Sequence, residues 1–393
     1  MAIRHQLAVY SPVPIGAPLR GVAAALRVTT DPRPALIDAL QRDFDATSVV
    51  LAGSGTQALQ VAIAHAVSRA GGEVPVALPA FSCFDVASAA IGANVSTALY
   101  DLDPGTLAPD LASFERVLSA GARVAVVAPL YGMAVDWDAL ETLAIKYGTI
   151  LIEDAAQGHG ATWRGRPLGA LGEISTLSFG RGKGWTGGGG GAVLFRRGNL
   201  ADSATPDAPR TAVEARTLAG LVAQWTLGRP SVYGIPHSIP ALGLGETTFH
   251  PPVTPADMTR GAAAAALHGA RASRQEAACR RENARWFLER VPQCDWIRSI
   301  RPTPGAAPGY LRLPIRFARG LSAMASPTRP LALGVAPSYP STLADLAPGR
   351  TGPERRWPGA DELARDLVTL PTHSRLTGAE RDEIVRMLHQ KPR

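Results

Sequence analysis

The chain has 393 residues, 46% of them hydrophobic and 19% charged, which is the composition of a folded globular protein with two or three domains, or one large and one small. It shows no apolar run of the ~18 residues needed to cross a bilayer and no signal-peptide pattern. Its three scattered cysteines argue against a disulfide framework or a zinc site and fit a reducing cytoplasm. The net charge is +7, but the basic residues are spread out and interleaved with glutamates in their densest stretch, 271–290, so neither nucleic acid nor a membrane is an expected partner.

Apolar strands alternate with helices from about residue 35 to residue 195. The predicted strands are 48–51, 75–78, 96–100, 124–129, 149–153, 174–179 and 192–195. The predicted helices are 34–44, 57–69, 84–93, 111–119 and 137–147. Continuously apolar strands in such an alternation indicate a mainly parallel sheet covered on both faces, so we expect an α/β fold in three layers.

The second half of the chain is less regular. Residues 200–257 contain many prolines and glycines and predict a loop-rich region, whereas 258–291 predicts one long helix. A strand is expected at 310–317, a surface loop or lid at 327–358 and a terminal helix at 378–388. We therefore expect a large domain at 34–257 and a smaller α+β domain at 258–393, with residues 1–33 packing near the smaller one.

Lys183 stands out because the chain has only three lysines among its 40 basic residues. It follows a predicted strand and precedes the glycine run 187–191. Arginine stays protonated in proteins, whereas a lysine amine can become neutral and act as a nucleophile. The alternative is a solvated lysine on a flexible glycine-rich linker, but such a linker is unusual between two closely spaced strands of one compact unit. Lys183 is thus a candidate catalytic residue.

Two further segments carry candidate site residues at the ends of predicted strands. Gly55 and Thr56 lie in a glycine-serine turn before a helix, where backbone amides and a hydroxyl can bind an anion such as phosphate; the alternative is an ordinary helix cap. Asp154 ends the strand at 149–153 within the segment Glu-Asp-Ala-Ala-Gln, where parallel sheets place their ligands. It could hold a cationic ring nitrogen or a metal, or simply cap the next turn.

Taken together, these segments resemble the DegT/DnrJ/EryC1/StrS family, the sugar-aminotransferase type of fold-type-I pyridoxal-phosphate enzymes. The resemblance runs from about Thr47 to Phe195, through the Ser-Gly-Thr turn, the loop and helix at 79–91, Glu-Asp-Ala-Ala-Gln, and Ser-Phe before Lys183. It resumes weakly at Ser338-Tyr339-Pro340 and at 370–373. It implies an aspartate-aminotransferase-like large domain that binds pyridoxal 5'-phosphate.

The resemblance also implies roles for individual residues. Lys183 bonds covalently to the cofactor and later moves a proton between substrate and cofactor, while Asp154 pairs with the pyridinium nitrogen. Gln157 lies against the ring, and Ser178 binds the phosphate together with the Gly55-Thr56 turn. The reaction implied is transamination from an amino acid, such as glutamate, to a keto acceptor such as a nucleotide-linked ketosugar, in a cytoplasmic homodimer with active sites at the interface.

The sequence departs from the family pattern at three places. Cys83 stands where an aromatic ring stacker is common, so Phe84 or Phe81 is the expected replacement. The Gly-Glu-Gly-Gly after the lysine reads Gly188–Gly191 and lacks the Glu. The Asn-x-Arg segment expected within 246–258, by which a neighbouring subunit completes the phosphate site, is absent in that form. These departures leave open another pyridoxal-phosphate reaction, such as elimination, substitution or decarboxylation, or a non-catalytic relative.

Three residues are weaker candidates for contact with the substrate. His159 follows the acid motif, Trp185 lies two residues after Lys183, and His373 belongs to a Leu-Pro-Thr-His segment that resembles the family. Packing inside the protein is the alternative for each of them. No metal ligand set is expected.

Overall fold

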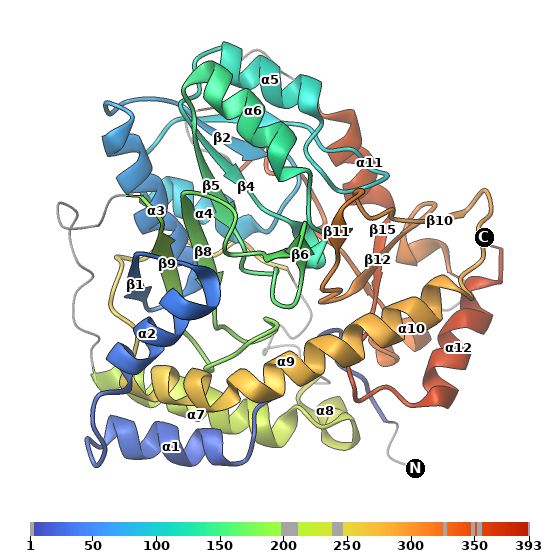
Figure 1. Cartoon of the computed structure of the whole chain (residues 1–393). Helices are drawn as coiled ribbons and strands as arrows, with labels where there is room; N and C mark the ends of the chain where they lie inside the picture. Colours follow the sequence, from blue (N-terminus) through green and yellow to red (C-terminus); the bar gives the residue numbers. More distant parts are fainter. Residues whose placement is uncertain are drawn as a thin grey trace.

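The structure is a computed structural model that describes residues 4–197, 211–237, 247–324, 328–346, 350–351 and 356–391. Its largest sheet has eight strands in the order β1-β9-β8-β5-β4-β2-β3-β14. Their bounds are β1 Ser48–Ala52, β2 Val76–Pro79, β3 Thr97–Tyr100, β4 Val124–Val127, β5 Ile150–Asp154, β8 Ile174–Ser178, β9 Gly191–Phe195 and β14 Arg350–Thr351. Neighbours pair in parallel except at β9, which runs antiparallel to β1 and β8, so the mainly parallel sheet is as expected (Figure 1).

Helices cover both faces of this sheet and make the three layers. One face packs against α3 Gly55–Arg69 and α4 Phe84–Gly92. The other packs against α2 Pro32–Phe44, α5 Leu111–Ser119 and α6 Trp137–Tyr147. Alternate strand residues feed the two layers: Val76 and Leu78 join the first cluster, and Ala77 between them joins the second. The predicted helices and strands of this half therefore occur, with ends shifted by a few residues.

The smaller part of the molecule is built around a second sheet, in the order β10-β12-β15-β13. Its strands are β10 Ile297–Ser299, β12 Leu313–Phe317, β13 Ala336–Pro337 and β15 Leu367–Leu370. Its helices are α10 Thr328–Ala332, α11 Pro358–Asp366 and α12 Gly378–Leu388, with a 3-10 turn at Leu321–Ala323. A third, small sheet joins β11 Ala306–Ala307 to β6 Thr162–Trp163 and β7 Arg166–Pro167 of the larger part.

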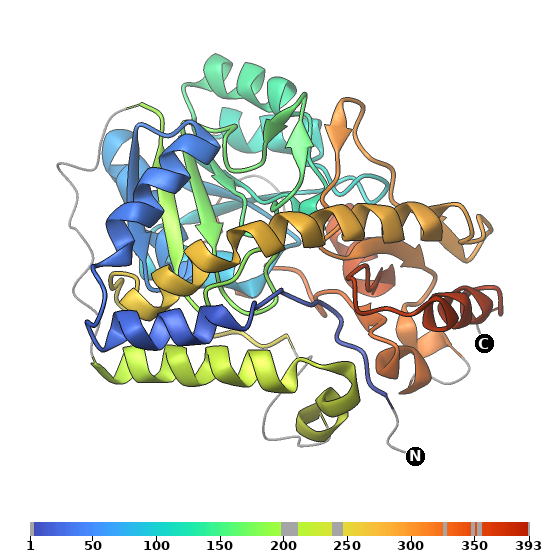
Figure 2. The same cartoon turned by 60° about the horizontal axis from the view of Figure 1, so that its bottom comes forward.

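One helix spans the molecule, as Figures 1 and 2 show. It is α9 Arg260–Leu288, capped by the Thr259 hydroxyl on the amide of Ala262. Its first half packs in the core of the larger part, and its end packs in the cluster shared with the second sheet. Alongside it lie α1 Gly16–Ala25 and α7 Thr211–Leu227 (Figure 2).

Two sequence predictions in the second half were wrong. Within 200–257 the described residues include α7 and α8 Pro230–His237, because the run from Thr211 is free of proline and rich in Ala and Leu. The predicted surface loop at 327–358 contains α10, β13 and β14 and buries Leu333, Leu343 and Trp357 in the core. Parts of both segments, 238–246 among them, lie outside the described residues.

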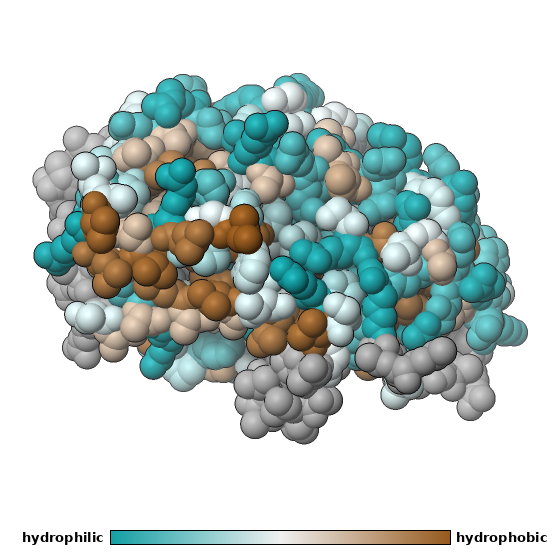
Figure 3. All heavy atoms as spheres, turned by 90° about the horizontal axis from the view of Figure 1, so that it is seen from below, coloured by the Kyte–Doolittle hydropathy of each residue, from teal (hydrophilic) through white to brown (hydrophobic). Residues whose placement is uncertain are grey.

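The lower face of the molecule exposes apolar side chains. Figure 3 shows them gathered over the helices at the bottom of Figure 1. On α1 and its flanks, Ile15, Leu19 and Leu26 are about 70% exposed, and Val222 and Leu227 of α7 are about 40% exposed. None of the described helices is long and apolar enough to cross a membrane.

Candidate active site

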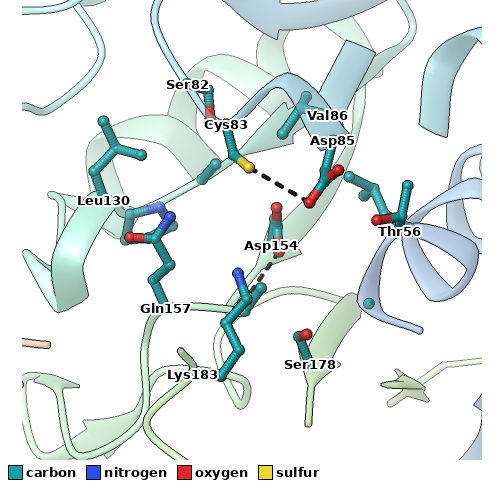
Figure 4. A pocket seen from close by; sticks show the side chains of 15 residues that line it. Thr56, Ser82, Cys83, Asp85, Val86, Leu130, Asp154, Gln157, Ser178 and Lys183 are labelled. Carbon is teal, nitrogen blue, oxygen red and sulfur yellow. Dashed lines mark hydrogen bonds between the residues drawn. The ribbon is translucent and has the colours of Figure 1, made fainter. Parts of the chain in front are cut away.

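A pocket lies at the carboxyl ends of the parallel strands. Asp154 ends β5, Ser178 ends β8, Ser82 and Cys83 follow β2, and Ala128 to Leu130 follow β4. The first turn of α3 closes the pocket from another side with Gly55 and Thr56. The remaining lining residues are Leu59, Asp85, Val86, Ala156, Gln157 and Lys183. Figure 4 shows Asp154, Gln157, Ser178 and Lys183 turned toward the same space.

The α3 turn is built to receive an anion. Ser54 caps the helix by accepting from the amide of Gln57, and the first amides of any helix have no partner inside it. Gly55 lies against Ser178 so closely that a Cβ at Gly55 would be 2.5 Å from the Cβ of Ser178. The absence of a side chain at Gly55 thus lets the Ser178 hydroxyl lie beside the free amides, where the helix dipole favours negative charge.

The two acids of the Glu-Asp segment have separate roles because successive strand residues point to opposite faces. Glu153 is fully buried and accepts hydrogen bonds from the amides of Gly169 and Leu171 and from the Ser175 hydroxyl, at 2.7, 2.9 and 2.8 Å. It is therefore a structural residue that orders the 169–172 turn. Asp154 faces the pocket instead.

The carboxylate of Asp154 is held at the pocket wall. It accepts from the amide of Ala156 at 3.1 Å and from the hydroxyl of Thr176 at 3.3 Å. Burial raises the pKa of Asp154, while the positive charge of Lys183 and these hydrogen bonds act in the opposite direction. A partly buried carboxylate with so few donors can accept a cationic group.

Lys183 lies in the loop that connects β8 to β9, two antiparallel strands whose ends Ser178 and Gly191 are register partners. Its amine points into the pocket, toward Asp154 and Gln157 (Figure 4). Lys146, in contrast, is exposed and forms an ion pair with Glu115 at 2.6 Å. The structure therefore separates a pocket lysine from a surface one.

Gln157 is fixed between two tyrosines. Its Oε1 accepts from the amide of Tyr131 at 2.9 Å, and its Nε2 donates to the Tyr339 hydroxyl at 2.8 Å. Tyr339 comes from the smaller part of the chain and packs against Tyr131, Phe81 and Phe84. The weak family-like segment at 338–340 thus contributes a tyrosine that orients a pocket side chain.

Cys83, and not Phe84, lines the pocket at the position expected for a ring stacker. The Phe84 ring lies in the core, 6.3 Å from the ring of Tyr339. The Cys83 sulfur lies 3.5 Å from Oδ2 of Asp85. Burial, together with Asp85, raises the pKa of the Cys83 thiol to about 12, so the thiol is protonated at neutral pH. A reactive thiolate is not expected here.

The three weaker substrate candidates lie outside the pocket lining. His159 and Trp185 pack near each other, with ring centroids 5.9 Å apart, and the Trp185 indole donates to the carbonyl of Ala266 at 2.8 Å. His373 is buried, and its Nε2 lies 2.8 Å from the carbonyl oxygen of Leu7. Burial lowers the pKa of both histidines to about 4, so both are neutral at pH 7.

Several lining residues were missed from the sequence. Asp85 and Val86 lie in the first turn of α4, which begins directly after the Ser82-Cys83 pair, and Leu130 lies shortly after β4. The rule that ligands bind at the carboxyl ends of parallel strands would have pointed to both segments. Part of the segment 246–258 lies outside the described residues. In the remainder, the carbonyl of Ala256 accepts from the amide of Gly53 at 2.7 Å, which ties it to the anion turn.

Comparison with known proteins shows what this geometry is similar to. Residues 37–214, somewhat less than half of the chain, match the DegT/DnrJ/EryC1/StrS aminotransferase family. This segment of the chain is therefore similar to that family. The matched region contains every lining residue of the pocket. Among the described residues, no group of three or more His, Cys, Asp or Glu side chains could hold a metal ion.

The chain is also similar in sequence to individual curated proteins. The chain is 36% identical over 191 residues to L-glutamine:2-deoxy-scyllo-inosose aminotransferase of Streptoalloteichus tenebrarius, over 48% of the chain and 42% of that protein. It is 32% identical over 166 residues to 3-amino-5-hydroxybenzoate synthase of Amycolatopsis mediterranei, over 41% of the chain and 42% of that protein. The chain thus matches about two fifths of the length of these curated relatives.

The fold similarity extends over nearly the whole chain. The solved sugar aminotransferase CalS13 of Micromonospora echinospora superposes with a TM-score of 0.72 at 20% identity, covering 99% of both chains. A family aminotransferase of Brucella abortus superposes with a TM-score of 0.70 at 19% identity, covering 94% of both chains. The chain therefore has the fold of these two solved structures over nearly its whole length, smaller part included.

Proposed function

We propose that this protein is a pyridoxal 5'-phosphate-dependent aminotransferase. The observation that carries the proposal is the pocket that joins a lysine amine, a partly buried carboxylate at a strand end and the first turn of α3. These three features supply a covalent attachment point, a partner for a ring nitrogen and a phosphate cradle, which is the set that this cofactor requires.

The residues present fit the cofactor. Its phosphate would bind the amides at the start of α3 with the hydroxyls of Thr56 and Ser178, in the space that Gly55 leaves open. Its ring nitrogen would pair with Asp154, whose pKa is raised by burial, so that a cation beside it would stabilise its charged form. Cys83 would face the ring where an aromatic residue is common. When bound, this cofactor supplies an electron sink that acidifies the Cα proton of an amino acid.

Three side chains of the pocket would then have separate chemical roles. The Lys183 amine would bond to the cofactor at rest and, once released, take the proton from the substrate Cα at Nζ. Asp154 would keep a proton on the ring nitrogen by opposing its loss with negative charge. Gln157, held by Tyr131 and Tyr339, would keep the ring in one orientation.

We propose an amino acid donor and a small keto acceptor, a ketosugar linked to a nucleotide or a related cyclic ketone. The support comes from relatives whose names state glutamine and 2-deoxy-scyllo-inosose as the reaction partners. Another reaction with the same cofactor remains the alternative, because the glycine run 188–191 lacks the Glu common in the family. Conversion of the bound cofactor to its amino form by a donor separates the two.

The test uses the purified protein with added cofactor and borohydride. The expected result is a reduced cofactor fixed to Lys183, found by peptide mass spectrometry, in the wild type and in the control variant Lys146→Ala. Lys183→Ala should give no such adduct. The same adduct in Lys183→Ala would refute the assignment, and failure of every donor to yield the amino form would favour the alternative reaction.

We also propose a cytoplasmic homodimer with active sites at the interface. Three cysteines without disulfides support a reducing compartment, and the apolar patch on α1 and α7 supports contact with a second copy of this chain. The expected large and small domains, 34–257 and 258–393, remain our proposal for the domain division, although residues 4–33 contact both parts.

A further inference from the structure

The backbone of Lys183 is held from outside its own loop. The loop carries glycines at 180, 182, 184 and 187–190, and glycine leaves a backbone conformationally free. Within the loop, the amide of Lys183 donates to the carbonyl of Gly180 over a long 3.4 Å. The Lys183 carbonyl accepts a 2.6 Å hydrogen bond from the hydroxyl of Ser11, a residue 172 positions away. This contact restrains the peptide unit that carries the pocket amine.

Ser11 belongs to the segment 4–14, which contains neither helix nor strand and runs between the two parts of the molecule (Figure 2). Its neighbour Tyr10 is held on both sides. The Tyr10 carbonyl accepts from Nη2 of Arg280 at 2.6 Å, and the Arg375 guanidinium lies 4.3 Å from the centre of the Tyr10 ring. The position of the Ser11 hydroxyl thus depends on α9 and on the smaller part of the chain.

Placing Arg280 at its position in α9 costs desolvation free energy. Its side chain is fully buried, and burial lowers its pKa to about 10, which leaves it charged at neutral pH. Its Nε and Nη1 have no hydrogen-bond partner among the residues that the structure describes. The nearby Glu276 is engaged by the amide and hydroxyl of Ser374, at 2.8 and 2.6 Å. An apolar side chain of similar volume would avoid the desolvation cost of such a charge.

The Arg280 guanidinium also abuts the residue that follows Lys183. A Cβ at Gly184 would lie 3.2 Å from Nη1 of Arg280 and 2.6 Å from the Cβ of His159. Arg280 therefore contacts the lysine loop directly and also holds, through Tyr10, the segment that binds the Lys183 carbonyl. Both contacts act on the backbone and neither reaches the pocket.

We infer that Ser11 and Arg280 are positioning residues for Lys183: the hydroxyl fixes its carbonyl, and the buried guanidinium fixes the segment that presents the hydroxyl. The inference rests on the proposed function, in which the amine of Lys183 must reach both the cofactor and the substrate Cα. A small misplacement of a reacting group is enough to slow a reaction by an order of magnitude or more.

The test measures the chemical reactivity of the Lys183 amine and does not depend on enzyme activity. The full chain without cofactor is acylated with acetic anhydride at several pH values, and modification is measured at Lys146, Lys183 and Lys391, the three lysines of the chain. In Ser11→Ala the acylation rate at Lys183 should change at least about threefold relative to wild type, with the other two lysines unchanged. Ser119→Ala is the matched control, since the Ser119 hydroxyl also donates to a carbonyl, at 2.9 Å, but on an exposed helix.

A second measurement uses the holoprotein. The rate at which an amino donor converts the bound cofactor in a single turnover should fall about tenfold in Ser11→Ala and stay at the wild-type value in Ser119→Ala. Arg280→Met should resemble Ser11→Ala in labelling, and Arg280→Lys should recover part of the wild-type rate. If Arg280→Met does not fold, the labelling of Lys183 in Ser11→Ala still tests the inference.

The inference is overturned if Ser11→Ala and Ser119→Ala label Lys183 alike, including the case in which Ser11→Ala only lowers the melting temperature. It is supported if labelling changes at Lys183 alone. Failure of the proposed function would look different: the wild type itself would form no borohydride-reducible adduct at Lys183, whatever the labelling rates.

Discussion

Replacing Gly55 by Ala should damage the anion turn while leaving the rest of the fold in place. The new Cβ would lie 2.5 Å from the Cβ of Ser178 and 2.6 Å from its hydroxyl oxygen. Apolar carbon atoms normally approach to about 3.5–4.0 Å. Ser178 or the start of α3 must therefore move by about 1 Å, and the neighbours are strand and helix backbone with little freedom to yield.

The size of the effect follows from two costs. Overpacking a tight contact lowers the free energy of unfolding by about 1–3 kcal/mol. Displacing a hydroxyl that donates to an anion removes a charge-assisted hydrogen bond of about 1.5–3 kcal/mol, which weakens binding of the cofactor phosphate roughly 10- to 150-fold. We therefore expect a lower melting temperature in the cofactor-free protein and a larger loss in cofactor affinity.

Cofactor affinity is measured by absorbance titration, and stability by thermal and urea unfolding. Gly180→Ala is the matched control, because its Cβ would meet the same Ser178 hydroxyl at an ordinary 3.5 Å. It should bind the cofactor within about twofold of wild type, a range smaller than one hydrogen bond. Equal affinity in Gly55→Ala and Gly180→Ala would refute the placement of the phosphate beside Gly55 and Ser178.

Three more predictions follow from the same geometry. Asp154→Asn should weaken cofactor binding yet raise the free energy of unfolding of the cofactor-free protein at pH 7. Burial raises the folded-state pKa of Asp154, so the wild-type protein loses stability as the pH rises from the ordinary carboxyl pKa to the folded-state pKa, and the variant does not. The gain over wild type should therefore shrink below about pH 4, and equal unfolding midpoints at all pH values would contradict the prediction. Glu153→Ala should lower the free energy of unfolding, measured by urea titration, by about 3 kcal/mol or more, because it leaves buried amides unpaired. In the same titration, replacement of the exposed Glu289 by Ala should change it by less than about 0.5 kcal/mol. Leu19→Asp, on the exposed face of α1, should shift the mass by sedimentation from dimer to monomer, and an unchanged mass would exclude this patch from the interface.

Local patterns were enough to predict most of the larger part of the fold. The strand at Val124 is apolar throughout, and the helix at Leu111 follows the capping residue Asp110, so both are readable within a few residues. The helix at Thr211 was missed because prolines and glycines on both sides of it dominated the composition of the region. The pairing of β9 with β1 joins segments far apart in sequence and has no local signal.

The site was predictable where its residues lie close to strand ends in a known order. Asp154 and Lys183 were found in this way, and the alternation of side chains along β5 separates Asp154 from Glu153 once the strand is known. Tyr339 and Ser11 could not be assigned from the sequence, because they reach Gln157 and Lys183 from 182 and 172 residues away. Such contacts are created by tertiary folding alone.

The lysine loop is closed at its base by the pairing of Ser178 with Gly191 and by the hydrogen bond from the amide of Phe179 to the carbonyl of Gly190. Its middle is also anchored, because the Trp185 side chain is buried in the core and donates to the carbonyl of Ala266 in α9. Opening residues 180–189 would expose this side chain and break the contact with Ser11. We therefore expect the amides around Trp185 to exchange with solvent deuterium slowly, as those of the core do, and not at the rate of an exposed glycine-rich loop.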